Sequence, residues 1–195
     1  MKRKEQAEVT KNKIVDGVIR LSRLMPFSEI QIRDICAEAK VSVGNFYHHF
    51  SSKQEVVGEI LYEYCKRMSS KKNTIQNKAS KERILEILQF FSQSLEELGS
   101  VIVLEVFSLN IVNKNNFMLS PDLFLYQEIY HTLEVLREEN RLKVCESVEE
   151  ICEEIIVVFR GFFYQWCLSG GGYNLSEEIA KKMGRYLDLF LAQEV

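Results

Sequence analysis

Residues that break helices are scarce in this chain, and this scarcity limits the folds open to it. Its 195 residues include two prolines and nine glycines. Proline removes a backbone donor and ends helices, so long stretches are free to be helical. Apolar residues recur at the spacing of one helix face, as in Ile14, Val18, Leu21 and Met25. Strand-like alternation is not found, and the sequence therefore predicts an all-α fold.

The pattern predicts about nine helices, several of which begin at a capping residue. Ser28 with Gln31, Ser42, Ser51-Ser52 and Ser80 have the residue types and positions of N-caps, and Ser120-Pro121 follows the cap-then-Pro rule. The predicted helices cover about 14–25, 28–39, 42–49, 52–72, 80–98, 101–112, 120–140, 148–168 and 176–192.

Three of these helices carry more apolar residues than one buried face needs. The segment 101–112 is apolar nearly all round, which predicts a buried helix. The last two helices have apolar stripes too wide for one side of a core. This surplus predicts a homodimer in which each chain contributes its last two helices to a four-helix interface.

Charge is distributed unevenly along the chain. The net charge is −3, but residues 1–55 carry ten Lys and Arg against seven Asp and Glu, and residues 56–195 carry fifteen against twenty-one. We call residues 1–55 the head and residues 56–195 the body, with the helix over 52–72 linking them. A mildly basic head on an acidic body permits nucleic-acid binding by the head.

The five cysteines are odd in number and show no C-x-x-C spacing. This usage favours reduced, mostly buried thiols in a cytoplasmic protein over a disulfide framework or a zinc site. The first residues lack the apolar core of a secretory signal. The longest apolar-rich run, 101–112, is far shorter than the ~20 residues that span a bilayer, so we expect no membrane association.

Residues 28–50 have the layout of a helix-turn-helix, in which the second helix enters the DNA major groove. Val41, Phe46 and Phe50 can hold that helix to its neighbours, and most of its other residues are small or able to hydrogen-bond. Gly44 near the helix start costs about 1 kcal/mol relative to Ala. Either a phosphate approaches the backbone there, or the glycine only relieves tight packing.

The stretch "IQIRDICAEAKVSVGNFYHHFSSKQEVV" resembles the DNA-binding head of the TetR family of bacterial transcriptional regulators, over about residues 10–60. The resemblance implies a homodimer on a palindromic operator, with a ligand-binding body that switches the heads. The matching residues are Arg33, Asp34, Ile35, Ala39, Val41, Ser42, Gly44, Phe46, Tyr47, His49, Phe50, Ser52 and Lys53.

Three residues depart from the family pattern. Gln31 replaces a threonine, and Gln can still donate to a phosphate. Lys40 replaces the glycine of the turn, at a cost of about 1 kcal/mol or more if the position needs a positive φ, although its ammonium group could reach a phosphate. Val43 cannot hydrogen-bond a base but can pack on a thymine methyl group. The operator sequence is therefore not transferable from relatives.

The resemblance assigns roles to residues of the predicted interface. Ser42, Tyr47, His49 and Lys53 stand at the family's phosphate-contacting positions, with the Gly44 backbone close to the strand. Val43, Asn45 and His48 are the candidates for contacts with base edges, and Asn45 suits adenine. With Gln31, Arg33 and Lys40, these residues form the predicted DNA-binding set.

No arrangement of residues indicates catalysis or a metal site. His48 and His49 are adjacent, so they do not share a helix face, and no ligand lies at helical spacing from either. The segment "SGGGYN" follows a helix rather than a strand and lacks the Lys of a phosphate-binding loop. We therefore expect no enzyme activity, metal or cofactor.

Aromatic residues are abundant in the body, and most are expected to be core. Some should line a ligand cavity, because such pockets are apolar with few polar groups. Glu105 and Arg160 stand out as charges in apolar helices, and they either pair with each other or contact a ligand. Aromatic walls with an acid favour an apolar and, as a hypothesis, cationic compound. The predicted ligand set is Phe91, Glu105, Phe107, Tyr126, Tyr130, Phe159, Arg160, Phe163 and Trp166.

Two functions follow from these observations. The first is a ligand-responsive transcriptional regulator, a repressor that binds a palindromic operator as a homodimer and is released by a small molecule. The alternative is an all-helical small-molecule-binding protein or enzyme whose head serves in protein interaction.

Overall fold

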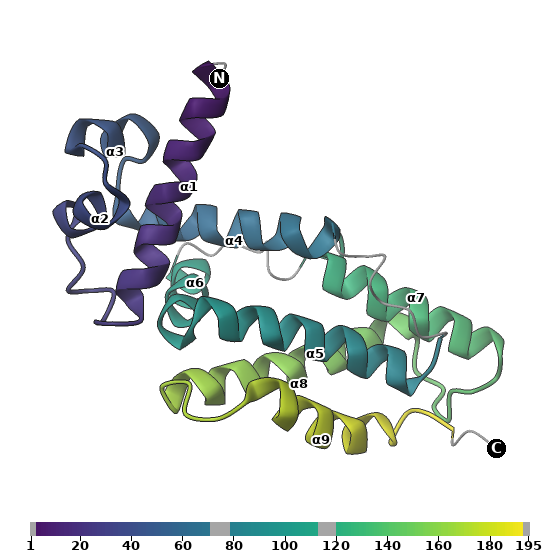
Figure 1. The fold of residues 1–195 in the computed structure, drawn as a ribbon. Coiled ribbons are helices and arrows are strands. Elements are labelled where there is room, and N and C mark those ends of the chain that lie inside the picture. The colour runs from purple at the N-terminus through teal and green to yellow at the C-terminus, as the bar shows by residue number, and fades with distance from the viewer. Residues whose placement is uncertain (1–2, 71–78, 113–119, 193–195) are drawn as a thin grey trace. The chain divides into compact units, whose positions relative to one another are not determined.

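The computed structural model describes residues 3–70, 79–112 and 120–192, and the described residues form nine α-helices. The chain divides into two compact units (Figure 1). The first unit comprises residues 1–64 and 98–115, and the second comprises residues 65–97 and 116–195. The predicted all-α class with about nine helices is confirmed. The boundary between head and body after residue 55 stays a prediction.

The first unit is built around helix α1 (Arg3–Ser22), against which α2 (Ile32–Ala39) packs, followed by α3 (Val43–His49). The first residues of α4 (Lys53–Ser70) close this bundle. Helix α4 is described as far as Ser70, and its predicted end near Lys72 lies outside the described residues. The core of the unit comprises Ile14, Val15, Val18, Leu21, Phe27, Ile30, Ile35, Cys36, Ala39, Phe46, Phe50, Val56, Val57, Ile60, Ile102 and Val106.

The helix predicted to begin at Ser28 begins instead at Ile32. Residues 26–30 form turns in which Glu29 N–H donates to the Pro26 carbonyl (3.0 Å) and Ile30 N–H to the Phe27 carbonyl (3.2 Å). The Asp34 carboxylate accepts from the Gln31 backbone N–H (3.0 Å) and so satisfies a donor that precedes the first helical turn. Pro26 thus displaces the helix start by about one turn.

Helix α6 (Ser100–Val112) belongs to the first unit, although α5 (Lys81–Leu98) just before it belongs to the second. The two are joined at Gly99, whose φ of 88° suits glycine. Ile102 and Val106 of α6 enter the core of the first unit. The expectation that α6 is buried all round was wrong. Leu104 is 42% exposed, and Ile111 and Val112 are more than 75% exposed, because only one side of the helix packs on that core.

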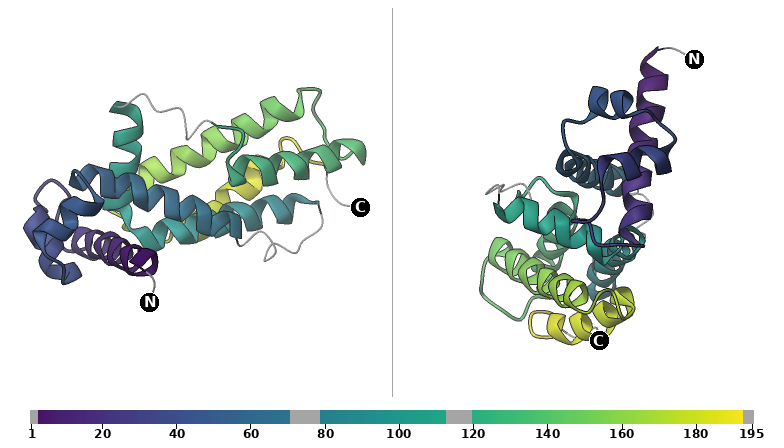
Figure 2. Two further views of the ribbon diagram at one scale, coloured as in Figure 1. Left: turned by 90° about the horizontal axis from the view of Figure 1, so that it is seen from above. Right: turned by 90° about the vertical axis from the view of Figure 1, so that its left-hand side faces the viewer.

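The second unit comprises α5, α7 (Phe124–Glu138), α8 (Val148–Leu168) and α9 (Leu175–Leu187). Helix α8 packs between α7 and α9, as Figures 1 and 2 show. Its bounds agree with the prediction, and Ser147 and Glu150 close its start as a capping box. The buried side chains of the unit include Ile84, Ile87, Leu88, Phe91, Leu95, Ile129, Leu133, Leu136, Ile151, Cys152, Ile155, Phe159, Phe163, Trp166, Leu175, Ile179, Met183 and Leu187.

Two ends in the second unit differ from the sequence pattern. Ser120 and Pro121 form a turn, in which the Ser120 hydroxyl accepts from the Asp122 N–H (3.2 Å), so α7 begins only at Phe124. Helix α9 was expected to reach about residue 192 but ends at Leu187. The segment after it pairs with residues 141–143 through two backbone hydrogen bonds of 2.8 Å, which remove it from the helix.

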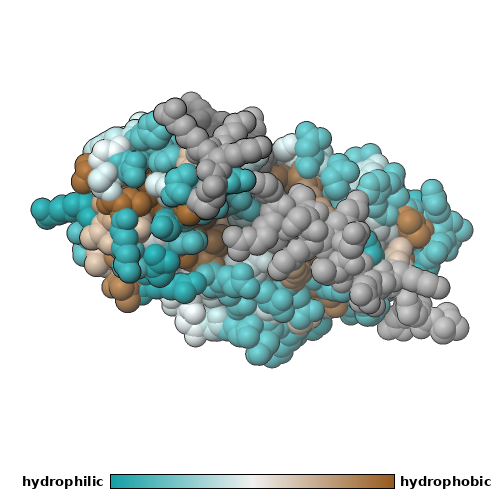
Figure 3. All heavy atoms as spheres, turned by 45° about the horizontal axis from the view of Figure 1, so that its top comes forward, coloured by the Kyte–Doolittle hydropathy of each residue, from teal (hydrophilic) through white to brown (hydrophobic). Residues whose placement is uncertain are grey.

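The second unit also contains a buried ion pair. The Glu128 side chain is almost fully buried and accepts from the Arg83 guanidinium (2.9 Å), which also donates to the Thr132 hydroxyl (3.2 Å). The pair thereby satisfies a charge that would otherwise be costly to bury. On the face drawn in Figure 3, hydrophobic side chains are scattered singly and in small groups among hydrophilic ones. None of the helices in the described ranges is long and apolar enough to cross a bilayer.

Candidate nucleic-acid interface and pockets of the body

Helix α3 is a short helix that two aromatic residues fasten to the head. Ser42 caps it, with its hydroxyl accepting from the Asn45 backbone N–H (3.1 Å). Phe46 is fully buried, and Phe50, which ends the helix in an extended conformation, is 2% exposed. The sequence pattern predicted both the cap and these two anchors, and the structure confirms them.

The outward side of α3 carries most of the predicted DNA-binding residues. Val43 is 48% exposed and Tyr47 is 56% exposed, and His49 is half-buried. The side chains that share this exposed surface are those of Ser42, Val43, Asn45, Tyr47 and His48. The structure therefore leaves the predicted phosphate-contacting and base-contacting residues of this helix accessible, with His49 only partly so.

Gly44 has no packing reason to be glycine. A Cβ built on it would meet only the Ser42 hydroxyl, at 3.9 Å, and its φ is not positive. The alternative that Gly44 merely relieves tight packing is therefore wrong for this chain. The glycine costs about 1 kcal/mol in helix stability, and no contact of the described residues accounts for it.

Lys40 forms the turn between α2 and α3 in a left-handed conformation. Its φ is 55° and its ψ is 47°, and the following Val41 N–H donates to the Cys36 carbonyl (3.0 Å). The position therefore requires the positive φ that glycine would adopt most easily. A non-glycine residue there costs about 1 kcal/mol, and the Lys40 side chain itself is exposed.

The two adjacent histidines lie edge to face, with ring centroids 5.2 Å apart. Burial, and after it the charges of His48 and Lys11, lowers the pKa of His49 from its ordinary value. At neutral pH His49 is therefore predominantly uncharged and can donate one ring N–H. Within the described residues, no group of three or more His, Cys, Asp or Glu side chains is placed to hold a metal ion.

Gln31 and Arg33 are exposed at the start of α2, as a surface role requires. Lys53 is different, because its ammonium group points into the chain. It donates to the carbonyl oxygens of Phe27 (2.7 Å), Ser28 (3.1 Å) and Ile30 (2.8 Å). The predicted contact of Lys53 with a phosphate would compete with these three hydrogen bonds.

Most of the predicted ligand-binding aromatics of the second unit are packed as core. The rings of Phe159 and Phe163 have centroids 4.2 Å apart and are almost fully buried. Trp166 is 3% exposed and its indole N–H donates to the Tyr173 carbonyl (3.0 Å). Phe91 stacks on Phe124 at 6.0 Å.

Tyr126 and Tyr130 stack on each other at 5.9 Å along one side of α7. The Tyr130 hydroxyl donates to the Glu149 carboxylate (3.1 Å), and this bond raises the pKa of Tyr130 to about 12. These two tyrosines differ from the buried aromatics because both are partly accessible.

A pocket of about 240 Å³ lies beside Tyr126, between the start of α7 and the middle of α8. It unites two predicted ligand-binding residues, Tyr126 and Arg160, and burial lowers the pKa of the Arg160 guanidinium. Glu153, which precedes Arg160 by two helical turns on α8, also lines this pocket and was not predicted from the sequence. The remaining lining residues are Ser120, Leu123, Leu125, Ile156 and Val157.

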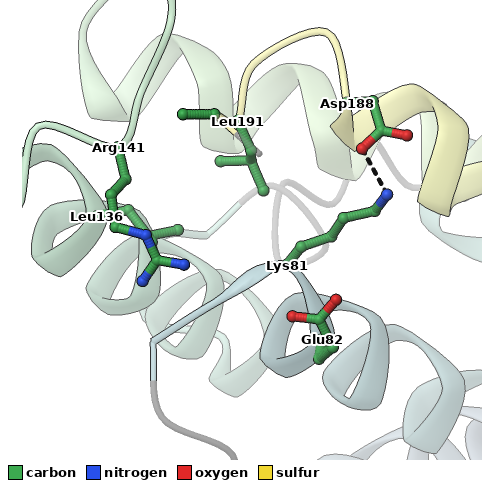
Figure 4. A pocket seen from close by; sticks show the side chains of 7 residues that line it. Lys81, Glu82, Leu136, Arg141, Asp188 and Leu191 are labelled. Carbon is green, nitrogen blue, oxygen red and sulfur yellow. Dashed lines mark hydrogen bonds and ion pairs between the residues drawn. The ribbon is translucent and has the colours of Figure 1, made fainter. Parts of the chain in front are cut away.

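A second pocket, of about 400 Å³, was not predicted from the sequence (Figure 4). Lys81 and Asp188 form an ion pair of 2.5 Å on one side of it, next to Glu82, and Arg141 lies on the opposite side near Leu136. The lining of the pocket holds two cationic and two anionic side chains. Leu136, Leu191 and Ala192 complete its lining.

Glu105 and Phe107 are half-buried on α6, in the first unit, whereas the other predicted ligand-binding residues lie in the second. The alternatives for Glu105 and Arg160, pairing or ligand contact, stay open. The four cysteines with described side chains are free thiols, and Cys145 is the exposed one. Burial raises the pKa of Cys152 to about 12 and that of Cys167 to about 11, so neither is a reactive thiolate at neutral pH.

Solved structures with the same fold cover nearly the whole chain. A putative transcriptional regulator from Saccharomonospora viridis in complex with choline aligns with a TM-score of 0.69 and 18% identity, over 94% of this chain and 98% of that one. FadR of Thermus thermophilus, a TetR-family transcriptional repressor in complex with lauroyl-CoA, aligns with a TM-score of 0.58 and 18% identity, over 95% and 97%.

NalD of Pseudomonas aeruginosa, the secondary repressor of the MexAB-OprM multidrug efflux pump, aligns with a TM-score of 0.64 and 15% identity, over 97% of this chain and all of that one. A search of curated protein sequences found no match. Residues 14–60 match the family model described as bacterial regulatory proteins, tetR family. The resemblance inferred from the sequence is thereby confirmed for residues 14–60, which are similar to the bacterial regulatory proteins of the tetR family.

Proposed function

We propose that this chain is a ligand-responsive repressor that binds a palindromic DNA operator as a homodimer. The observation that carries this proposal is the outward side of α3. Most of its exposed side chains can hydrogen-bond, and no packing contact within the described chain requires its Gly44. A recognition helix requires these properties, because the backbone must approach phosphate while side chains reach base edges.

The roles proposed on this helix follow from chemistry and position. Ser42, Tyr47 and neutral His49 can each donate to a phosphate oxygen, and Lys40 adds a charge beside them. Asn45 and His48 can hydrogen-bond base edges, Val43 can pack on a thymine methyl group, and Gln31 and Arg33 supply donors from α2. Phosphate contacts set the register and the salt dependence of binding, and base contacts set the preferred sequence.

The homodimer is proposed to form through α8 and α9. Val157, Tyr164 and Leu168 are each more than 60% exposed on α8, and Leu189 is equally exposed just after α9. The three residues on α8 fall at the i, i+7 and i+11 positions of one helix face, with Gly161 at i+4. A second copy would cover these apolar side chains and supply the two-fold symmetry that a palindromic operator requires.

The switch is proposed to act through the junction of α5 and α6. Helix α5 belongs to the second unit and continues through Gly99 into α6, which contributes Ile102 and Val106 to the core of the first unit. A ligand that displaces α5 or α6 therefore also acts on the packing beneath α1. In the dimer this changes the separation of the two heads, so that they no longer fit half-sites about one helical turn apart.

The effector is proposed to be a small, largely apolar molecule. Neighbours with this fold have been solved with choline, with lauroyl-CoA and with triclosan. In this chain the pocket beside Tyr126 offers apolar walls with one carboxylate and one guanidinium. A panel of hydrophobic cations, neutral phenols and acyl compounds, scored by melting temperature, tests the class. The cationic hypothesis is wrong if only neutral or anionic compounds shift the melting temperature.

The function itself is tested by enriching bound fragments from random or genomic duplex DNA. We expect a two-fold symmetric site, bound with strong salt dependence, and we propose that the protein works in the bacterial cytoplasm, where such DNA is found. The Tyr47→Ala variant should lose this binding and keep its fold, since the Tyr47 side chain is exposed. A variant that binds normally would refute the assignment of the interface.

The alternative is an all-helical small-molecule-binding protein or enzyme whose head serves in protein interaction. It would be favoured by a dimer that binds no duplex at low salt and without ligand.

A further inference from the structure

Lys53 is the first residue of α4, and its ammonium group donates to three backbone carbonyl oxygens of the head. The three hydrogen bonds to the Phe27, Ser28 and Ile30 carbonyls are 2.7, 3.1 and 2.8 Å long. The ammonium group also lies over the Phe27 ring, 4.7 Å from its centroid. A lysine has three N–H protons, and all three are used within the chain.

The carbonyl groups that Lys53 binds belong to the segment between α1 and α2. Phe27 is 3% exposed and Ile30 is 1% exposed. The turns in this segment satisfy the Phe27 carbonyl once, through the Ile30 N–H. Removing the ammonium group would leave partly buried carbonyl oxygens without their charged partner, and such a loss is costly.

The contact joins two points that flank the helix-turn-helix in the chain. Phe27, Ser28 and Ile30 lie just before α2, and Lys53 lies just after α3, at sequence separations of 26, 25 and 23 residues. Helices α2 and α3 lie between these points. The bonds therefore close a loop around the two helices that present the DNA-binding residues.

We propose that Lys53 is a positioning residue and not a phosphate ligand. It acts as an internal clasp, which holds the segment before α2 to the start of α4. An ammonium group held by three carbonyl oxygens has no proton free for a phosphate. It would have to break bonds to a buried segment in order to reach one. The role of the clasp in DNA binding rests on the function proposed above, whereas its role in the head does not.

Two substitutions at Lys53 separate the clasp from a phosphate contact. Lys53→Met removes the charge, and Lys53→Arg keeps the charge but cannot place three donors of one nitrogen on three carbonyl oxygens, because the guanidinium is planar. If Lys53 is a clasp, both variants should bind operator about tenfold or more weakly, at a temperature where circular dichroism shows them folded. A phosphate ligand would instead tolerate arginine.

The salt dependence of binding gives a second, independent measure. Each phosphate contact contributes about −0.9 to the slope of log K against log salt. A clasp predicts that Lys53→Met keeps the wild-type slope while affinity falls equally for specific and non-specific duplexes. A slope shallower by about 0.9 for each head would overturn the proposal.

Hydrogen exchange in the absence of DNA tests the clasp even if the chain binds no operator. The amide protons of Glu29 and Ile30 close the turns of the bound segment. They should exchange at least about tenfold faster in both Lys53 variants, because the loss of a charged hydrogen bond shifts the opening equilibrium by that order. Wild-type exchange rates in Lys53→Met would overturn the proposal.

Lys40→Met is the matched control. It removes the same charge from an exposed lysine of the head. Hydrogen exchange of the Glu29 and Ile30 amides should therefore stay at the wild-type rate. Should Lys53→Met fail to fold, Lys53→Gln keeps two N–H donors and should show an intermediate exchange rate. An exchange rate for Lys53→Gln equal to that of the wild type would count against the clasp.

Discussion

Helices α3 and α8 divide their residues between core and surface in different ways. In α3, Phe46 alone among seven residues is buried, and the outward side chains are mostly small or able to hydrogen-bond. In α8, eight of 21 residues are buried, and the outward side still carries Val157, Tyr164 and Leu168. A polar partner requires the first kind of surface and an apolar partner the second. Substitutions can test whether this division of roles is correct.

The largest effect is expected at Phe46, the anchor that lies within α3. Phe46→Ala should lower the free energy of unfolding of the head by about 3–5 kcal/mol, because a fully buried aromatic side chain is lost without replacement. Tyr47→Ala, next to it, should change that free energy by less than about 0.5 kcal/mol. Urea unfolding followed by circular dichroism measures both. Equal effects would mean that α3 has no separate inner and outer sides.

The outward side of α8 should matter for assembly rather than for folding. Leu168→Asp should convert the proposed homodimer to a monomer of unchanged helicity, because the apolar side chain is exposed in the single chain. Operator binding should weaken by at least about 100-fold, since two linked heads bind far more tightly than one. Light scattering and operator titration measure the two effects. Leu24→Asp, at an equally exposed site in the first unit, is the control and should stay dimeric.

Two smaller effects of opposite sign are expected when Gly44 is replaced, one on the stability of the head and one on operator binding. Gly44→Ala should raise the stability of the head by up to about 1 kcal/mol, because alanine favours the helix and its Cβ meets only the Ser42 hydroxyl. The same methyl group should weaken operator binding by keeping phosphate away from the backbone. Thermal unfolding and DNA titration on one preparation measure both. Stabilisation with undiminished binding would place the DNA elsewhere.

The smallest effect concerns pH. The pKa of His49 is lowered in the folded chain, so the unfolded chain holds this proton more tightly. Lowering the pH through the ordinary range of His49 should therefore reduce the stability of the free head. A phosphate beside His49 would raise its pKa, so operator binding should strengthen between about pH 8 and pH 6. His49→Gln should flatten this dependence, and a profile unchanged by that substitution would exclude His49 from the contact.

The sequence predicted the head better than the body because the head is local. The cap at Ser42 and the anchors Phe46 and Phe50 lie within nine residues, so spacing alone determines their arrangement. The failed helix starts at Ser28 and Ser120 show the limit of this reasoning. A serine can equally well stabilise a turn, as the Ser120 hydroxyl does by accepting from the Asp122 N–H, and residues 26–30 form turns through their backbone.

In the body, residue type does not distinguish a core residue from a pocket wall. Phe159, Phe163 and Trp166 were plausible ligand contacts by composition, and the structure packs them into the core. The pocket of Tyr126 and Arg160 depends on how α7 approaches α8, which no spacing within either helix specifies. The same limit applies to Lys53 in the head. The motif predicts a lysine there but not that its side chain turns toward the Phe27 carbonyl.

The membership of α6 in the first unit has a consequence for anyone who exchanges parts between such regulators. A fragment that stops after α4 would lack Ile102 and Val106, and the core of its head would be left open at that point. A chimaera that takes only the amino-terminal segment from this chain would inherit a foreign α6 against a native α1. Transplants should therefore carry residues 100–112 along with the head, as a second, separate graft.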